Sequence, residues 1–203
     1  SSPDSSRRGN ILGMIGMTIA VATTVSFLPP AAYLWMLIAL VIGGAIGTTT
    51  ALKIKMTAMP QLVAAFHSLV GLAAVLVAAA AFYNPHAFGI TDAAGLIKVG
   101  SRVEMSLGVV IGAITFSGSV VAFAKLQALV SGNPVVFPGQ HWLNLLIGIV
   151  IAALLVYFCM SQSPQLFWIM TGLAFVIGFL IIIPIGGADM PVVVSMLNSY
   201  SGW

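Results

Sequence analysis

The stretch Leu166-Phe-Trp-Ile-Met-Thr-Gly-Leu-Ala-Phe-Val-Ile-Gly-Phe-Leu-Ile-Ile-Ile-Pro-Ile185 contains no charged side chain. A helix needs about 20 apolar residues to cross the hydrocarbon core of a bilayer, so this stretch predicts a transmembrane helix. Similar runs lie before it, at Asn10–Leu28, Ala31–Thr50, Gln61–Phe82, Met105–Val130 and Trp142–Met160. A last apolar run, Met190–Trp203, is too short to span a membrane.

The composition supports this assignment for the whole chain. Of 203 residues, 60% are hydrophobic and 5% are charged, whereas a soluble domain has roughly 25% charged residues. This excludes a free-standing soluble enzyme, a disordered chain and a nucleic-acid-binding protein. The runs are long and do not alternate, so they predict helices and not barrel strands. We therefore expect an all-α, polytopic transmembrane helix bundle in a single domain over residues 1–203, with six complete spans and a truncated seventh.

Cationic side chains predict how the bundle is oriented. With the N-terminus inside, five cations lie on the inner side and two on the outer side; the five are Arg7, Arg8, Lys53, Lys55 and Lys125, and the two are Lys98 and Arg102. The positive-inside rule then favours an inside N-terminus. We expect the first ten residues to form a polar loop, and Lys125 to extend to the inner surface.

Small and polar residues give further expectations about packing and loops. The pairs Gly43/Gly47 and Gly108/Gly112 have a four-residue spacing that allows close helix approach in lipid. In the longest loop, Thr91-Asp92 is positioned to begin a short interfacial helix.

His67 is the ionisable side chain that lies deepest within an apolar run. If its helix begins near Pro60, helical rise places His67 about 10 Å into the membrane. Ionisable groups at such depth are usually functional, and imidazole exchanges protons near neutral pH. We therefore interpret His67 as a proton-handling residue. The alternative is a neutral histidine that bonds a neighbouring helix.

Polar residues on two other helices are predicted at a similar depth. The last apolar run has polar or small residues on one face at Ser195, Asn198, Ser199 and Gly202. The run that ends near Lys125 contributes Thr115, Ser117 and Ser119. If the three helices face one another, these groups form a hydrogen-bonded site around His67. Asp189 precedes the last run and is either a helix cap or an inner-side carboxylate that gathers protons or contacts a soluble partner.

Three blocks of sequence resemble one known family. They are Gln61-Leu-Val-Ala-Ala-Phe-His67, Thr115-Phe-Ser-Gly-Ser119 and Gly186-Gly-Ala-Asp-Met-Pro-Val-Val-Val-Ser-Met-Leu-Asn-Ser-Tyr-Ser-Gly-Trp203. They are similar to the membrane domain of proton-translocating NAD(P) transhydrogenase, in the part that belongs to the β subunit in bacteria. The resemblance implies inward proton flow coupled to hydride transfer from NADH to NADP⁺ on separate soluble domains.

The resemblance also implies roles for individual residues. The proton pathway is expected to include His67 and Asn198, with Ser117, Ser119 and Ser195 as lining. Asp189 is expected at the inner mouth, in communication with the NADP(H)-binding domain. No catalytic, metal or cofactor-binding residue is expected in this chain. Unlike some bacterial members, the chain has Ala58 and Gln61 in place of glutamates.

Partners and location follow from the same resemblance. The expected partners are the NAD(H)- and NADP(H)-binding soluble domains, the remaining transmembrane helices, the lipid bilayer and a second copy of the complete enzyme, without nucleic acid. The family's soluble NADP(H)-binding domain is not in these residues, so we expect a fragment of a longer polypeptide. The expected location is a bacterial cytoplasmic or a mitochondrial inner membrane.

Two other functions remain open from the residues alone. A secondary transporter could use His67 and Asn198 as a cation site, but it needs a substrate cavity at mid-membrane. A membrane scaffold without transport predicts a His67 that is buried among aliphatic side chains and has no polar partner.

Overall fold

A computed structural model describes residues 3–202 of the chain. These residues form seven α-helices and three short 3₁₀ turns, with no β-strand among the described residues. Six helices are long and apolar enough to cross a membrane, and the seventh, α7, covers only Met190–Ser201. The predicted all-α, multi-pass fold is confirmed. The helices fall into two compact units divided between Ile54 and Lys55, which we describe separately.

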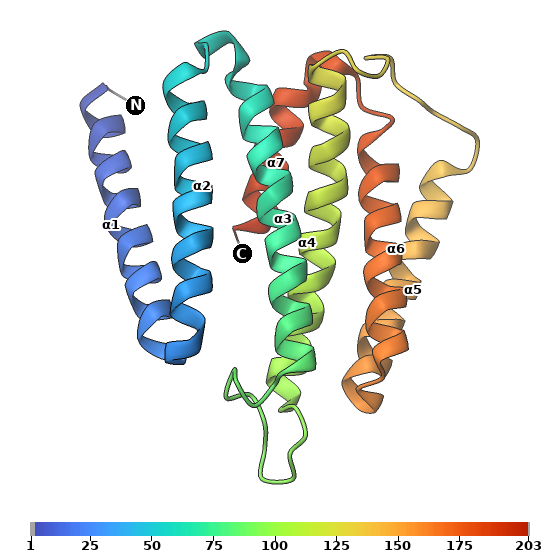
Figure 1. Cartoon of the computed structure of the whole chain (residues 1–203). Coiled ribbons are helices and arrows are strands. Elements are labelled where there is room, and N and C mark those ends of the chain that lie inside the picture. Colours follow the sequence, from blue (N-terminus) through green and yellow to red (C-terminus); the bar gives the residue numbers. More distant parts are fainter. Residues whose placement is uncertain (1–2, 203) are drawn as a thin grey trace. The chain divides into compact units, whose positions relative to one another are not determined.

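The first unit is an antiparallel pair of helices (Figure 1). Helix α1 covers Pro3–Phe27 and α2 covers Tyr33–Lys53. The hydroxyls of Thr18, Thr24 and Thr49 bond backbone carbonyls four residues earlier at 2.7–2.9 Å, which satisfies them without a second helix. The expected polar loop over the first ten residues was wrong, because the helix already begins at Pro3.

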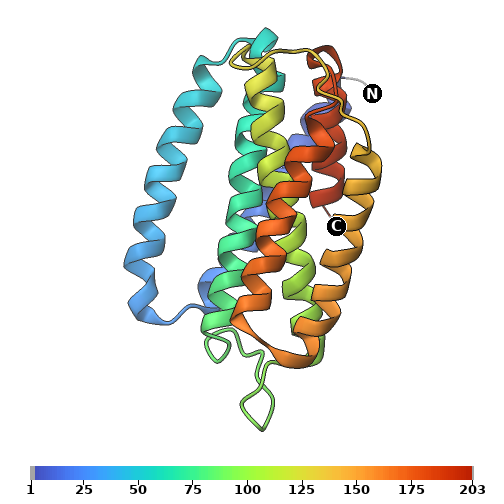
Figure 2. The same ribbon diagram turned by 90° about the vertical axis from the view of Figure 1, so that its right-hand side faces the viewer.

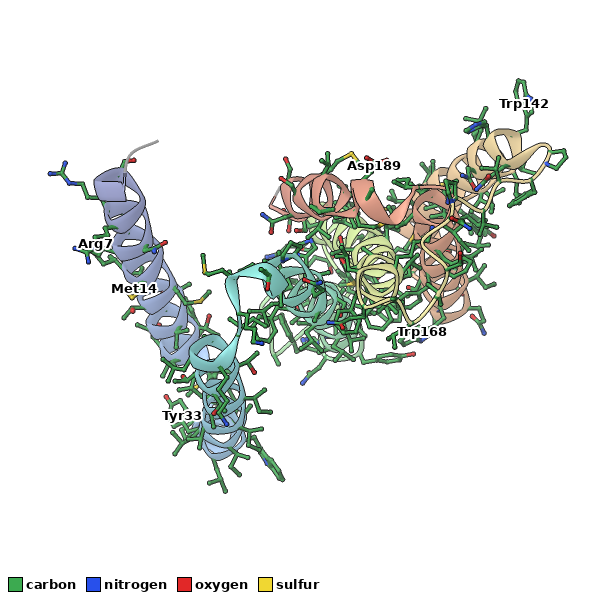
Figure 3. All side chains as sticks on the ribbon, turned by 90° about the horizontal axis from the view of Figure 1, so that it is seen from above. Arg7, Met14, Tyr33, Trp142, Trp168 and Asp189 are labelled. Atoms are coloured by element: carbon green, nitrogen blue, oxygen red, sulfur yellow. The ribbon has the colours of Figure 1, made fainter. Side chains whose placement is uncertain are left out.

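The second unit is a five-helix bundle with α4 at its centre (Figures 1 and 2). Its helices are α3 (Met59–Tyr83), α4 (Val99–Leu126), α5 (Gln140–Ser161), α6 (Pro164–Ile182) and α7. Helices α3, α6 and α7 each have a proline in the first turn, where its missing N–H costs nothing. We call the end where α3 and α7 begin the Asp189 end; Figure 3 shows it from above.

Close crossings on two sides of α4 fix its position. A Cβ built on Gly71 of α3 would lie 2.6 Å from the backbone nitrogen of Phe116 and 2.7 Å from the carbonyl oxygen of Gly112. On α6, a Cβ on Gly178 would lie 2.6 Å from the carbonyl oxygen of Ile114. Only glycine fits at these positions. By contrast, a Cβ built on Gly108, which the four-residue spacing pairs with Gly112, would meet no atom within 4 Å outside the neighbouring backbone of its own helix.

Two apolar clusters lie along the bundle. At the end opposite Asp189, Phe82 stacks on Phe167 with ring centroids 5.0 Å apart and also contacts Phe158. Near the Asp189 end, Ala64 and Ala122 pack with Met190 and Val194 on one side of α7. The second cluster therefore attaches the short α7 to α3 and α4.

The loop between α3 and α4 has no helix, so the expectation of an interfacial helix at Thr91 was wrong. Thr91 and Ile97 instead form an isolated antiparallel bridge. The Asp92 Oδ1 atom accepts hydrogen bonds from the backbone nitrogens of Ala94 (2.9 Å) and Leu96 (3.0 Å). Asp92 thus closes a tight turn around its own side chain, with Gly95 at a φ of +78°.

The crossing of α3 and α4 gives a stability prediction. Gly112→Ala should lower the thermal stability of the full enzyme by about 1–3 kcal/mol, the usual cost of overpacking, because the new methyl would lie 2.8 Å from the Gly71 carbonyl oxygen. Gly108→Ala, one turn away on the same helix, should be neutral. Thermal denaturation in detergent measures both, and equal midpoints would contradict the predicted crossing.

Candidate functional site

His67 lies on the buried face of α3, and its ring is 5% exposed. The buried positions of this helix recur at Ala64, His67, Gly71 and Val75, which is the spacing of one helical face. Because α3 begins at Met59, helical rise places His67 about 12 Å from the Asp189 end of the helix. The imidazole is therefore inside the bundle and within a membrane-spanning segment.

The imidazole has a hydrogen-bonding partner on α7. His67 Nε2 lies 3.2 Å from the hydroxyl oxygen of Ser201, and the same hydroxyl lies 3.1 Å from the backbone carbonyl oxygen of Asn198. A serine hydroxyl has one proton to donate. It accepts from a protonated Nε2 while donating to Asn198, or it rotates and donates to a deprotonated Nε2. The pair therefore suits either protonation state of Nε2.

Ser119 of α4 is predicted to lie at the level of His67. Gly71 contacts Gly112 and Phe116, so the antiparallel register brings His67, one turn earlier in α3, to the level of residues 116–120. The Ser119 side chain is fully buried, and its hydroxyl has no hydrogen-bond partner among the described residues. A buried hydroxyl normally has a partner, and this one does not use its own helix. The position is suited to a buried water.

A second unpaired oxygen lies toward the Asp189 end. Gln61, near the start of α3, has its Nε2 3.5 Å from the carbonyl oxygen of Leu126. Its Oε1 atom is buried without a partner. Six residues separate Gln61 from His67, or about 9 Å along the helix axis. Unsatisfied polar atoms therefore occur both at the level of His67 and between that level and the Asp189 end.

The other predicted residues are not brought together with His67. Ser117 is two positions from Ser119 and points about 200° away from it. The Ser117 hydroxyl bonds the Ala113 carbonyl at 3.0 Å and faces Gly178 of α6. Ser195 and Asn198 lie on the exposed flank of α7, beside its buried face. Among the described residues, neither side chain forms a hydrogen bond with His67.

Asp189 lies at the start of α7 at the end of the bundle (Figure 3). It occupies the N-cap position but makes no side-chain capping hydrogen bond, and it is exposed. Asp189 thus holds the N-cap position that one of its two interpretations predicted, but its carboxylate does not bond the helix. The carboxylate is left accessible at this end of the bundle.

Ser201 was not among the predicted site residues, although the sequence contained a signal for it. The buried residues of α7 are Met190, Val193, Val194 and Leu197, and Ser201 continues their spacing. The sequence prediction was based instead on the polar flank of the helix, which carries Ser195 and Asn198. Among the described residues of α7, Ser201 is the one polar residue that continues the apolar face, and it is the residue that contacts His67.

Comparison with known proteins agrees with the three sequence blocks. The chain matches the profile of the family described as NAD(P) transhydrogenase beta subunit over residues 1–203. The chain belongs to this family. It is 61% identical over 203 residues to the NAD(P) transhydrogenase subunit beta of Rhodospirillum rubrum, and equally to that of a named strain of the same species. Each alignment covers 100% of this chain and 44% of the relative.

Membership of the transhydrogenase beta subunit family makes the chain part of a multi-pass membrane protein, in agreement with the six spans. His67, Ser119 and Ser201 all come from the sequence blocks that indicated the family. The structure adds that the first and last of these blocks meet at one hydrogen bond.

Replacement of Ser119 tests whether its hydroxyl is unpaired or has a hydrogen-bond partner that stabilises the fold. Ser119→Ala should leave the stability of the enzyme unchanged or raise it by up to about 1 kcal/mol, because the cost of an unsatisfied buried group is removed. Thermal denaturation with Ser117→Ala as the comparison variant measures this effect. A clear loss of stability with Ser119→Ala would show that the hydroxyl has a structural partner.

Proposed function

We propose that the chain is the proton-translocating membrane part of an NAD(P) transhydrogenase, which couples inward proton flow to hydride transfer from NADH to NADP⁺. The observation that carries the proposal is a buried imidazole, 3.2 Å from a serine hydroxyl, inside the membrane-spanning part of a transhydrogenase beta subunit family member. Imidazole is the side chain best suited to take up and release a proton near neutral pH.

The neighbouring polar atoms support a route to this imidazole. The unpaired Gln61 Oε1 and Ser119 hydroxyl offer positions for waters between the Asp189 end and His67. Because the Ser201 hydroxyl can either accept from or donate to Nε2, this hydrogen bond can be kept in both states of that nitrogen. We assign His67, Ser119 and Ser201 to the proton pathway. Asn198, Ser195 and Ser117 are kept as pathway residues on the family resemblance alone.

Asp189 is proposed as the contact to the soluble NADP(H)-binding domain. It is exposed and makes no capping hydrogen bond, so its charge is available to a partner. Hydride transfer takes place on the NAD(H)- and NADP(H)-binding domains, and this chain binds no cofactor. The chain spans 44% of the length of the relatives, and we propose that the remaining helices and a second copy of the enzyme complete the assembly in an inner membrane with the N-terminus inside.

The scaffold alternative fits the site less well, since it predicts a His67 without a polar partner. The transporter alternative differs from the proposal in its driving reaction. Proton movement driven by NADH and NADP⁺ without any transported solute supports the proposal, whereas dependence on a co-transported solute supports the transporter.

Replacement of His67 tests the proposed function directly. In the complete enzyme reconstituted in proteoliposomes, His67→Ala should abolish proton uptake and the hydride transfer coupled to it, because no other imidazole lies inside the described spans near this site. Binding of NADP(H) to its soluble domain should remain. A pH-sensitive dye inside the vesicles and nucleotide absorbance follow the two processes.

The matched control is His86→Ala, which removes an imidazole from the exposed loop between α3 and α4. There His86 Nδ1 lies 3.3 Å from the Thr91 hydroxyl, so the control also removes a histidine–hydroxyl contact. It should pump normally. Normal pumping by His67→Ala would refute the proposed function.

A further inference from the structure

Lys125 near the end of α4 is buried, at 6% exposed, so the expectation that it extends to the inner surface was wrong. Its ammonium group donates to three backbone carbonyl oxygens, those of Ile183 (2.6 Å), Ile185 (2.7 Å) and Asn133 (3.3 Å). Three donors meet three acceptors. All three ammonium hydrogens are therefore used by backbone carbonyls inside the bundle, and not by water at the surface.

Two of these carbonyls belong to the turn between α6 and α7 that carries Asp189. Ile183 follows directly on α6, which ends at Ile182, and Asp189, the N-cap residue of α7, comes six residues later. Lys125 thus satisfies carbonyls that a helix end leaves without partners, and a cation there is favoured by the helix dipole.

The loop between α4 and α5 also forms hydrogen bonds with the turn between α6 and α7. The Gly187 nitrogen donates to the Gly132 carbonyl oxygen at 2.8 Å, and the Val135 nitrogen donates to the Ile183 carbonyl oxygen at 3.3 Å. Figures 1 and 2 both show this loop passing beside the turn. Through Asn133, Lys125 also binds the loop itself. One ammonium group therefore joins the α4–α5 loop to the turn that leads to Asp189.

We propose that Lys125 is a positioning residue for Asp189. By holding the carbonyls of Ile183 and Ile185, it fixes the α6–α7 turn in the arrangement in which Asp189 meets the NADP(H)-binding domain. The contact between Asp189 and the NADP(H)-binding domain rests on the proposed function. The effect of Lys125 on the order of the turn can be measured without any transhydrogenase activity.

Gln140 offers a matched control, because it also bonds a backbone carbonyl near the end of α6. Its Nε2 donates to the Leu180 carbonyl oxygen at 3.1 Å, and its side chain is 2% exposed. Gln140 thus also satisfies a carbonyl near the end of α6, but among the described residues its side chain forms no hydrogen bond with the turn. A purely structural role predicts that Lys125→Met and Gln140→Met behave alike.

The first experiment measures order in the turn. In the complete enzyme with Cys159 and other reactive cysteines replaced, Ile185→Cys places a thiol at a half-buried position of the turn that packs against the apolar cluster around α7, so maleimide labelling of this thiol requires the turn to open. Lys125→Met should raise the labelling rate about tenfold, since charge-assisted hydrogen bonds are lost, and Gln140→Met should leave it unchanged. Equal rates in the two variants would overturn the proposal.

The second experiment asks whether Lys125 acts through Asp189. Lys125→Met and Asp189→Asn should each raise the KM for NADP⁺ more than they lower kcat, and the double variant should be no worse than the worse single variant. Gln140→Met combined with Asp189→Asn should be additive, because these residues share no partner. Additivity of Lys125→Met with Asp189→Asn would overturn the proposal.

If Lys125→Met does not accumulate in the membrane, Lys125→Arg takes its place. It keeps the charge, but a planar guanidinium cannot direct its donors to three carbonyls arranged around one ammonium. Labelling should then rise by a smaller factor, about threefold, and an unchanged rate would contradict the proposal. If His67→Ala pumps normally while labelling responds to Lys125, the proposed function fails and the ordering of the turn stands.

Discussion

A backbone carbonyl at the end of a helix has no partner within that helix, and lipid offers no water to replace it. The second unit depends on how α4 meets this constraint. Near one end of α4, the Arg102 Nη1 atom donates to the Cys159 carbonyl oxygen at 2.6 Å, near the end of α5. Near the other end, Lys125 donates to the two carbonyls that follow α6. Two buried cations on one helix thus complete the ends of its two neighbours.

This arrangement explains how α4 accommodates two buried cationic side chains, Arg102 and Lys125, in a chain in which 5% of the residues are charged. Each cation is surrounded by carbonyl oxygens and needs no carboxylate partner. Together with the glycine crossings at Gly71 and Gly178, they set the angle and height of α4 between α3 and α6. Ser119 and the residues around it are consequently held on a helix that is fixed at both ends and on two sides.

The fold could be predicted from the sequence because each span is long, apolar and bounded by proline or glycine. His67 could be found because a titratable group within such a span is rare. Other features depend on neighbours distant in the sequence. Hydropathy does not distinguish a Lys125 that extends to the surface from one that binds Ile183 and Ile185, because both lie at the end of a span. The contact between Ser201 and His67 could also not be predicted without knowing which side of α7 packs against α3 and α4. The buried face and the polar flank of α7 are adjacent, so that Asn198 on the flank directly follows the buried Leu197.

Pro60 and Pro191 give the site a fixed spacing. Each proline fixes the first turn of its helix, so the number of residues that follow determines both the height and the direction of His67 and of Ser201. One added residue between Pro60 and His67 would turn the imidazole by about 100° and move it by about 1.5 Å, away from α7. The number of residues between each proline and the side chain that follows it is therefore as important to the site as the identity of those side chains.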